Sequence, residues 1–211
     1  MTPSKKEFED ALIARHGKEN YEKFKASRVA VCGLGGLGSN VAVSLARAGV
    51  GYLHLIDFDT VDISNLNRQH YFVDQIGMAK TEALDLIIKR IAPFCYIKTD
   101  CTKVTDKNIY SLLEKDDIVV EAFDSAEEKA VLVNGVLELF SGKPVVSGSG
   151  MAGFESLNLI KTRRIGKRLY ICGDETSDVE EEGSLFAPRV MSCAAHEAMT
   201  VLRLISGITE P

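Results

Sequence analysis

A glycine-rich turn between two short apolar runs constrains the fold of this chain more than any other feature. Residues 29–32 (Val-Ala-Val-Cys) have the composition of a buried strand, and the loop Gly33-Leu-Gly-Gly-Leu-Gly38 follows them directly. An amphipathic helical stretch comes next, and then a second apolar run that ends at Asp57. This order predicts a strand–loop–helix–strand unit that binds a nucleotide.

The expected role of each glycine follows from its lack of a side chain. Gly33 permits a tight turn, Gly35 lets the backbone approach a phosphate, and Gly38 lets the helix pack closely on the strand. The start of the helix offers free N–H groups to anionic oxygens. Asp57 follows the glycine loop at the sequence spacing, roughly 20 residues, at which a carboxylate accepts a ribose hydroxyl. The pattern predicts a nucleotide site without saying which nucleotide.

Composition narrows the class of protein. The 211 residues fit a single domain (1–211), and a net charge of −5 argues against a general nucleic-acid partner. No apolar stretch approaches the ~20 residues that span a bilayer, and the N-terminus has no apolar core like that of a signal peptide, so we expect a cytoplasmic protein with no membrane partner. The five cysteines form no C-x-x-C pair. No zinc site or disulfide framework is therefore expected.

The rest of the chain alternates between expected helices and strands. Residues 1–26 form a helical extension opened by a capping box at Ser4–Glu7. Expected helices at 80–91, 108–113 and 127–140 alternate with expected strands at 94–99, 117–123 and 143–147. This alternation predicts an α/β fold: a Rossmann-like, doubly wound, mostly parallel sheet with helices on both faces.

After Gly148 the pattern changes. Residues 157–161 and 168–172 are expected to be two further strands, antiparallel and joined by a tight basic turn. Residues 173–187 contain six carboxylates within Gly173–Ser184, so we expect a mobile acidic loop there. Pro188 is expected to open a final apolar helix that ends near Gly207.

Polar residues gather where two of the strands end. The long connection 57–77 leaves the carboxyl end of the second strand and carries Arg68, and Lys80 follows it. Cations near a phosphate site suit a reaction that builds negative charge on phosphorus. Asp124 ends a further strand at the same edge, where a carboxylate can hold Mg²⁺ on phosphate oxygens. From these residues alone, an NAD-dependent oxidoreductase and an ATP-dependent enzyme both remain open.

The motifs GLGGLGSN, LIDFDTVDISNLNRQ and IGMAKTEAL together resemble the ThiF/MoeB adenylyltransferases, which are relatives of the ubiquitin-activating enzymes. The resemblance covers residues 27–206. The later pieces EAFDSAEEK, VVSGSGMAGFES, LYICGD and APRV are similar to the short ThiF form, which activates the sulfur carrier of thiamine biosynthesis. The two C-x-x-C pairs of the longer relatives are absent from this chain.

The resemblance implies ATP- and Mg²⁺-dependent adenylation of the C-terminal glycine of a small ubiquitin-like sulfur carrier of the ThiS type, ending in Gly-Gly, with release of pyrophosphate. It also implies a homodimer in which an arginine, here Arg15, enters the partner's site. Catalytic roles would fall to Arg68, Lys80 and Asp124, with Asp124 on the metal. The implied nucleotide-binding residues are Gly33, Gly35, Gly36, Leu37, Gly38, Asp57, Asp59, Asn65, Asn67, Arg68 and Lys80.

Three alternatives stay open beside that function. They are an NAD-dependent oxidoreductase, adenylation of a molybdopterin-type carrier or a tRNA-modification substrate, and a nucleotide-binding protein without catalysis. A C-terminal carboxylate has a pKa near ~3.5 and needs no general base, which agrees with the lack of a nucleophile–histidine–acid arrangement. Cys172 could carry a thioester or persulfide, but the acidic residues after it favour a structural role.

Overall fold

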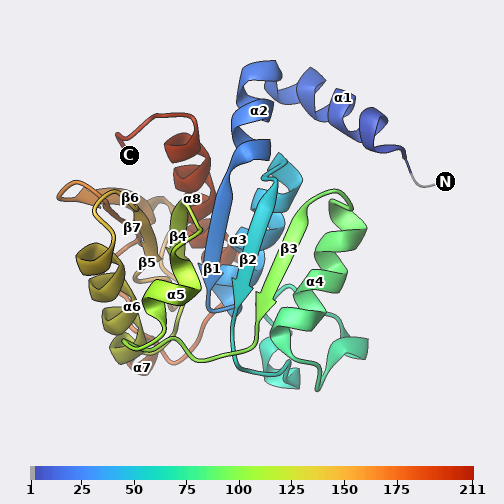
Figure 1. The fold of residues 1–211 in the computed structure, drawn as a ribbon. Helices are drawn as coiled ribbons and strands as arrows, with labels where there is room; N and C mark the ends of the chain where they lie inside the picture. The colour runs from blue at the N-terminus through green and yellow to red at the C-terminus, as the bar shows by residue number, and fades with distance from the viewer. Residues whose placement is uncertain (1–2) are drawn as a thin grey trace.

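Seven strands form one sheet in the computed structural model, which describes residues 3–211 (Figure 1). The strand order is β3-β2-β1-β4-β5-β7-β6, and every neighbouring pair is parallel except β6–β7. The strands are β1 (Arg28–Cys32), β2 (Tyr52–Ile56), β3 (Tyr96–Asp100), β4 (Ile118–Glu121), β5 (Val145–Gly148), β6 (Lys161–Ile165) and β7 (Leu169–Gly173). The predicted Rossmann-like, mostly parallel sheet is confirmed.

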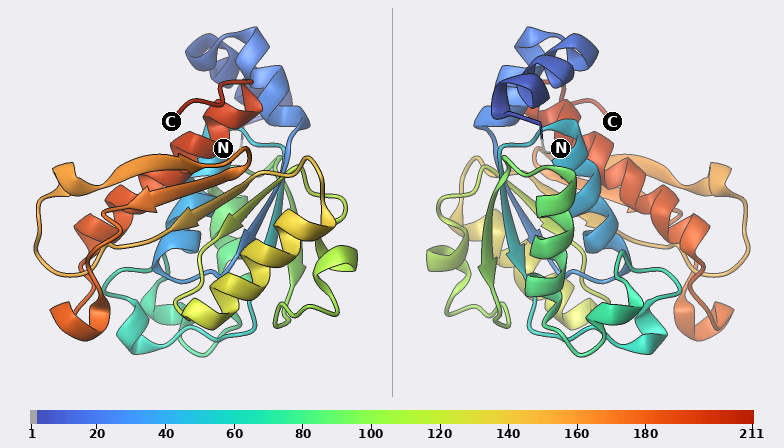
Figure 2. Two further views of the ribbon diagram at one scale, coloured as in Figure 1. Left: turned by 90° about the vertical axis from the view of Figure 1, so that its left-hand side faces the viewer. Right: turned by 90° about the vertical axis from the view of Figure 1, so that its right-hand side faces the viewer.

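Helices cover both faces of this sheet (Figure 2). The helices are α1 (Lys5–His16), α2 (Lys18–Ala26), α3 (Gly36–Ala48), α4 (Lys80–Ile91), α5 (Ile109–Leu113), α6 (Ala126–Leu139), α7 (Val179–Glu182) and α8 (Ala187–Ile205). Apolar residues of α3, α4 and α8 pack in one buried cluster, and those of α5 and α6 pack in a second on the opposite face. Because both faces are covered, all of residues 29–32 in β1 are buried.

The segment expected to be a helical extension contains α1 and α2; residues 1 and 2 lie outside the residues that the structure describes. Ser4 and Glu7 form the predicted capping box at the start of α1. In Figure 1, α1 and α2 lie beyond the amino ends of the strands, and α1 projects from the body of the molecule. Phe8 on α1 packs edge-on against Phe94, with ring centroids 5.7 Å apart.

The predicted boundaries of the last two strands need one correction. The strand expected at 157–161 is displaced: residues Leu157–Leu159 form a 3-10 turn, and β6 runs from Lys161 to Ile165. Four residues assigned to the basic turn, 162–165, therefore belong to a strand. Alternating exposure along β6 explains why, because one side of the strand packs on the protein and the basic side chains Arg163 and Lys161 point outward.

The acidic segment 173–187 begins with an anchored residue. The carboxylate of Asp174, 3% exposed, forms an ion pair with the guanidinium of Arg189 on α8. Burial alone would raise the pKa of Asp174, but hydrogen bonds from Ser177 and Thr176 and the charge of Arg189 lower it overall. The remaining carboxylates lie on or near the short helix α7.

Among residues 3–211, none of the helices has the length and apolarity to cross a membrane.

Candidate nucleotide site

The glycine loop lies where the order of strands reverses. β1 pairs with β2 on one side and with β4 on the other, so the connections after β1 and β4 leave the sheet in opposite directions. Ligands of open α/β sheets bind at such a point, outside the carboxyl ends of the strands. This edge is at the bottom of Figure 1, where the arrowheads of β2 and β3 point.

Two glycines of the loop are required by close backbone contacts. Gly33 has a φ of +88°, and a β-carbon on it would lie 2.6 Å from the carbonyl oxygen of Ala122. A β-carbon on Gly38 would lie 1.8 Å from the carbonyl oxygen of Gly33. These contacts agree with the tight turn predicted at Gly33 and the close helix packing predicted at Gly38.

Gly35 leaves the outer side of the loop open. It precedes α3, and the nearest atom to a β-carbon on it would be Nε2 of Gln69, at 3.7 Å. Gly36, the first residue of α3, is enclosed, because a β-carbon on it would lie 2.9 Å from Cγ1 of Val190 and 3.5 Å from the stem of Arg68. The N–H groups that begin a 13-residue helix thus lie next to a backbone position, Gly35, that is open on its outer side.

Asp57 supports the glycine loop directly. One carboxylate oxygen accepts the N–H of Leu34 at 2.6 Å, and the other accepts the N–H of Asp59 at 2.8 Å. The residue is 6% exposed. Each carboxylate oxygen keeps a second lone pair, so the same group can still accept a ribose hydroxyl.

The connection after β2 is tied back to the glycine loop. The amide of Asn40 on α3 donates to the carbonyl oxygens of Gly36 (2.7 Å) and Arg68 (3.2 Å). The phenol of Tyr71 donates to the carbonyl oxygen of Leu34 at 2.8 Å. These bonds hold residues 65–71 beside the loop. The sequence signal for them is the Ser39-Asn40 pair directly after the last glycine.

The two predicted cations lie at this edge with their positions set by neighbours. Nη1 of Arg68 donates to Oδ1 of Asn67 at 2.9 Å, and the stem of Arg68 lies about 3.5 Å from the β-carbon position of Gly36. The ammonium of Lys80 pairs with Oδ2 of Asp59 at 2.8 Å, and Lys80 is 6% exposed. Asp59 therefore orients Lys80, a relation that the sequence alone does not reveal.

Two of the other predicted site residues, Asn65 and Asn67, are hydrogen-bonded within the chain, whereas Asp124 and Arg15 are exposed. Oδ1 of Asn65 accepts the N–H of Asp62, the residue that caps the 3-10 turn Ile63–Asn65, and Asn67 donates to the carbonyl oxygen of Leu185 in the acidic segment. Asp124 is exposed after β4, and within residues 3–211 its side chain makes no hydrogen bond or ion pair. Arg15 is exposed on α1 near the amino ends of the strands, so its own chain does not bring it to this edge (Figure 1).

Within the part of the chain that the structure describes, the two buried cysteines on β7 and α8 do not have the surroundings of a nucleophile. Cys172 on β7 is fully buried, and burial raises the pKa of its thiol to about 12. Burial also raises the pKa of Cys193 on α8, whose thiol donates to the carbonyl oxygen of Cys172 at 3.2 Å. Both residues are packed as small core side chains.

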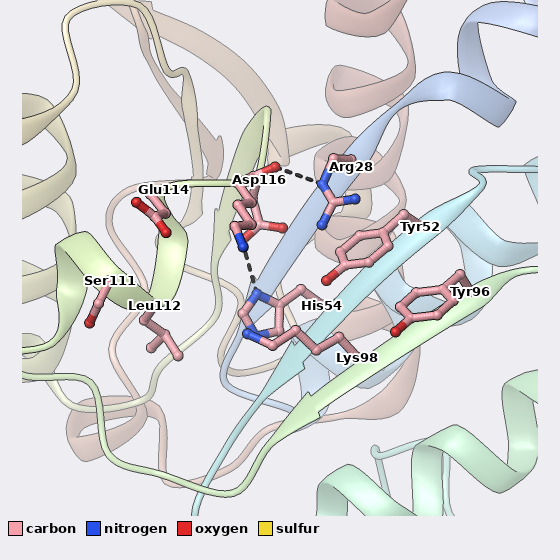
Figure 3. A pocket seen from close by; sticks show the side chains of 10 residues that line it. Arg28, Tyr52, His54, Tyr96, Lys98, Ser111, Leu112, Glu114 and Asp116 are labelled. Atoms are coloured by element: carbon pink, nitrogen blue, oxygen red, sulfur yellow. Dashed lines mark hydrogen bonds and ion pairs between the residues drawn. The ribbon is translucent and has the colours of Figure 1, made fainter.

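A hollow lies on the open part of the sheet, away from the glycine loop (Figure 3). It has a volume of about 520 Å³ and is lined partly by the stacked rings of Tyr52 and Tyr96. At its base, the two ring nitrogens of His54 are bonded to Asp116 (2.9 Å) and Asp100 (2.7 Å). Because the histidine is already paired on both sides, the glycine-loop edge is the better candidate site.

The fold and this edge define a Rossmann-like nucleotide-binding protein. The ThiF family model matches residues 9–211, and the chain belongs to the ThiF family. It is 32% identical over 200 residues to the molybdopterin-synthase adenylyltransferase of Escherichia coli, covering 92% of this chain and 78% of that protein. It is 30% identical over 203 residues to the adenylyltransferase and sulfurtransferase UBA4 of Lodderomyces elongisporus, covering 93% of this chain but only 44% of that relative.

Solved structures share the fold at lower sequence identity. The E. coli tRNA N6-threonylcarbamoyladenosine dehydratase TcdA, in complex with ATP, superimposes with a TM-score of 0.86 at 22% identity, covering 98% of both chains. E. coli MccB with ATP matches with a TM-score of 0.70 at 24% identity, covering 91% of this chain and 59% of that one.

Proposed function

We propose that this protein adenylates the C-terminal carboxylate of a small ubiquitin-like carrier protein, using ATP and Mg²⁺ and releasing pyrophosphate. The observation that carries the proposal is that the segments carrying Arg68, Lys80 and Asp124 follow β2 and β4, the two strands that flank β1, and so lie at the edge of the sheet where the glycine loop begins. Two cations and a carboxylate there suit phosphoryl chemistry better than hydride transfer. The family membership and the adenylyltransferases among its relatives support the same class of reaction.

The residues at this edge fit a nucleoside triphosphate and a divalent cation. The outer side of Gly35 is open to a phosphate, and the carboxylate of Asp124 has no partner of its own within residues 3–211. In the proposal, Gly33, Gly35, Gly36, Leu37 and Gly38 form the phosphate loop, Asp57 receives the ribose, and Asp124 holds Mg²⁺. A bound Mg²⁺ would neutralise charge on the phosphates. Asn67, Arg68 and Lys80 would bind phosphate oxygens, while Asn65 and Asp59 hold those residues in position.

The residues of the site then have two tasks in the proposed reaction. The carrier's carboxylate is ionised at neutral pH, so the site must align it with the α-phosphorus and stabilise the charge that develops there. Arg68 can do the second task because it lies over the first turn of α3 and Asn67 orients its guanidinium. This division of labour needs no general base and no cysteine.

The preferred carrier is a sulfur carrier of the ThiS type from thiamine biosynthesis, ending in Gly-Gly. The support is the similarity of residues 121–129, 145–156 and 169–174 to the short ThiF form. The relatives named above act in molybdopterin synthesis or as combined adenylyltransferase and sulfurtransferase, so their carriers are the competing candidates. We further propose a homodimer.

The test is ATP–pyrophosphate exchange with a panel of purified carriers. Exchange should require Mg²⁺ and a carrier with a Gly-Gly terminus, and the ThiS-type carrier should support the fastest rate. Arg68→Ala should lower the exchange rate by roughly 10²–10³-fold, the usual loss when one charge-stabilising donor is removed. Arg90→Ala, an exposed arginine at the end of α4, is the matched control and should exchange normally.

Other results would identify the alternatives. Tight NADH binding without ATP binding would support an oxidoreductase and overturn the proposal. ATP binding without exchange on any carrier would support a nucleotide-binding protein without catalysis. Near-normal exchange in Arg68→Ala would remove the role assigned to that side chain.

A further inference from the structure

A buried polar cluster joins the ends of β4 and β5 beside the glycine loop. Glu121, the last residue of β4, is fully buried, although it is the only charged residue in that strand. Its Oε2 accepts the hydroxyl of Ser147 on β5 at 2.5 Å and forms an ion pair with the ammonium of Lys129 on α6. Lys129 also donates to the carbonyl oxygen of Gly148 at 2.9 Å. Three elements are thus held together by one carboxylate and one ammonium, which we call the Glu121–Lys129 pair.

The other oxygen of Glu121 shapes the turn that leads to Asp124. Oε1 accepts the N–H of Phe123 at 2.8 Å, so the chain bends back on the end of β4 before Asp124 emerges. Ser125 then caps α6, the helix that carries Lys129. The turn therefore has both ends tied to the Glu121–Lys129 pair.

The same turn also supports the glycine loop. The carbonyl of Ala122, between Glu121 and Phe123, occupies the space where a β-carbon on Gly33 would lie, at 2.6 Å. The N–H of Ala122 donates to the carbonyl oxygen of Cys32 at 2.8 Å. A displacement of this turn would therefore move both Asp124 and the start of the phosphate loop.

We infer that Glu121 and Lys129 are positioning residues for the metal–nucleotide site, holding the turn 122–124 in the geometry that presents Asp124 to Mg²⁺ and supports Gly33. The inference rests on the proposed function only in assigning Mg²⁺–ATP to this edge. Neither side chain needs to touch the nucleotide. Groups that orient a metal ligand from behind typically change metal affinity by roughly 10–100-fold when they are removed.

Charge balance in the cluster agrees with this role. Glu197 on α8 is fully buried, and within the described chain neither of its carboxylate oxygens has a hydrogen-bond partner. Burial raises the pKa of Glu197, the charge of Glu121 raises it further, and Lys129 opposes the shift. The ammonium of Lys129 is paired directly with Glu121, so its position is set by the carboxylate at the end of β4 and not by Glu197.

The experiment measures binding of Mg²⁺–ATP by isothermal titration calorimetry, with no carrier present. Glu121→Ala and Lys129→Met should each weaken binding of Mg²⁺–ATP about tenfold while changing binding of metal-free ATP much less. Glu121→Gln should lose less than Glu121→Ala, because the amide oxygen can still accept the N–H of Phe123. Lys103→Met is the matched control. It removes an exposed ion pair with Glu128, which lies on α6 next to Lys129, and the variant should bind Mg²⁺–ATP like the wild type.

Hydrogen exchange of backbone amides separates positioning from general damage to the fold. Backbone amides of residues 122–125 and 33–35 should exchange hydrogen faster in Glu121→Ala, while amides of α4 should not. If Glu121→Ala does not fold, Glu121→Gln and Lys129→Met carry the same comparison. Equal Mg²⁺–ATP affinity in folded Lys129→Met and wild type would overturn the inference.

The outcome is distinguishable from failure of the proposed function. A wild-type protein that binds Mg²⁺–ATP but exchanges pyrophosphate with no carrier would contradict the proposed reaction and leave this comparison valid. A wild type that binds no Mg²⁺–ATP would overturn both.

Discussion

Glu197 is a carboxyl group in the core of the protein, and its environment has a measurable consequence. The side chain is fully buried, and burial raises its pKa well above the usual 4.5. In the unfolded chain this group loses its proton near pH 4.5, whereas the folded protein retains it. Between those two pKa values the folded state binds one more proton than the unfolded state, so the free energy of unfolding decreases as pH rises.

We predict that Glu197→Gln removes this dependence. Glutamine has nearly the shape of a protonated glutamic acid and does not titrate, so the variant should gain stability relative to the wild type as the pH rises above about 4.5, by at most about 1.4 kcal/mol per pH unit. Urea unfolding at several pH values measures the difference. Glu138→Gln, at an exposed position on α6, is the control for replacing one carboxylate by an amide. A stability difference between Glu197→Gln and the wild type that does not change with pH would mean that Glu197 is ionised in the folded protein.

At the scale of the element, Gly38 is required by the packing of the fold, whereas Gly35 is proposed to be required by the bound nucleotide. Gly38→Ala places a methyl group where the carbonyl of Gly33 now lies, so the start of α3 must shift, and we expect a loss of about 1–3 kcal/mol in stability. Gly35→Ala meets no atom nearer than 3.7 Å in the protein, and its stability should change by less than about 1 kcal/mol.

The two variants should then differ in what they do to ATP. A methyl group on Gly35 lies on the open side of the loop, where the phosphate is proposed to approach, so Gly35→Ala should bind ATP at least tenfold more weakly while remaining stable. Thermal unfolding and calorimetric ATP titration on the same samples give both quantities. A stable Gly35→Ala protein with normal ATP affinity would place the phosphates elsewhere.

At the scale of the whole molecule, most of the fold follows from local patterns. Turn residues and buried apolar runs predict the order β1–α3–β2 and the later alternation, because parallel neighbours need a long crossover connection, which is usually a helix. The displaced boundary of β6 could not be predicted, since its inward-facing residues Thr162 and Arg164 are polar and the strand lacks the apolar–polar alternation of a half-buried strand. Pairing with β7 determines that strand.

Less of the candidate site than of the fold can be predicted from the sequence. Residues 33–38 and 57–68 are contiguous motifs, so their meeting at one edge can be expected. The Glu121–Lys129 pair could not, because the contact joins residues from two elements and depends on a third, Ser147. The signal that the sequence does contain is a lone acid in the apolar run Ile-Val-Val-Glu. Arg15 poses the opposite problem, because a proposed role exists but one chain alone does not bring the residue to the site.

A second copy of the chain can be tested as the source of that arginine. If Arg15 acts in the partner's site, Arg15→Ala and Arg68→Ala homodimers should both exchange pyrophosphate slowly, because every site lacks one of the two arginines. In a mixed dimer, the site on the Arg15→Ala chain retains its own Arg68 and receives Arg15 from the other chain. The second site lacks both.

Random reassociation of the two variants should therefore restore about one quarter of the wild-type rate, since half the dimers are mixed and each has one complete site of two. Mixing must follow reversible dissociation, and size-exclusion chromatography checks that dimers re-form. No gain on mixing, with both homodimers slow, would place Arg15 and Arg68 in the same chain's site. That result would require α1 to leave its position beyond the amino ends of the strands, because the edge where Arg68 lies is at their carboxyl ends (Figure 1).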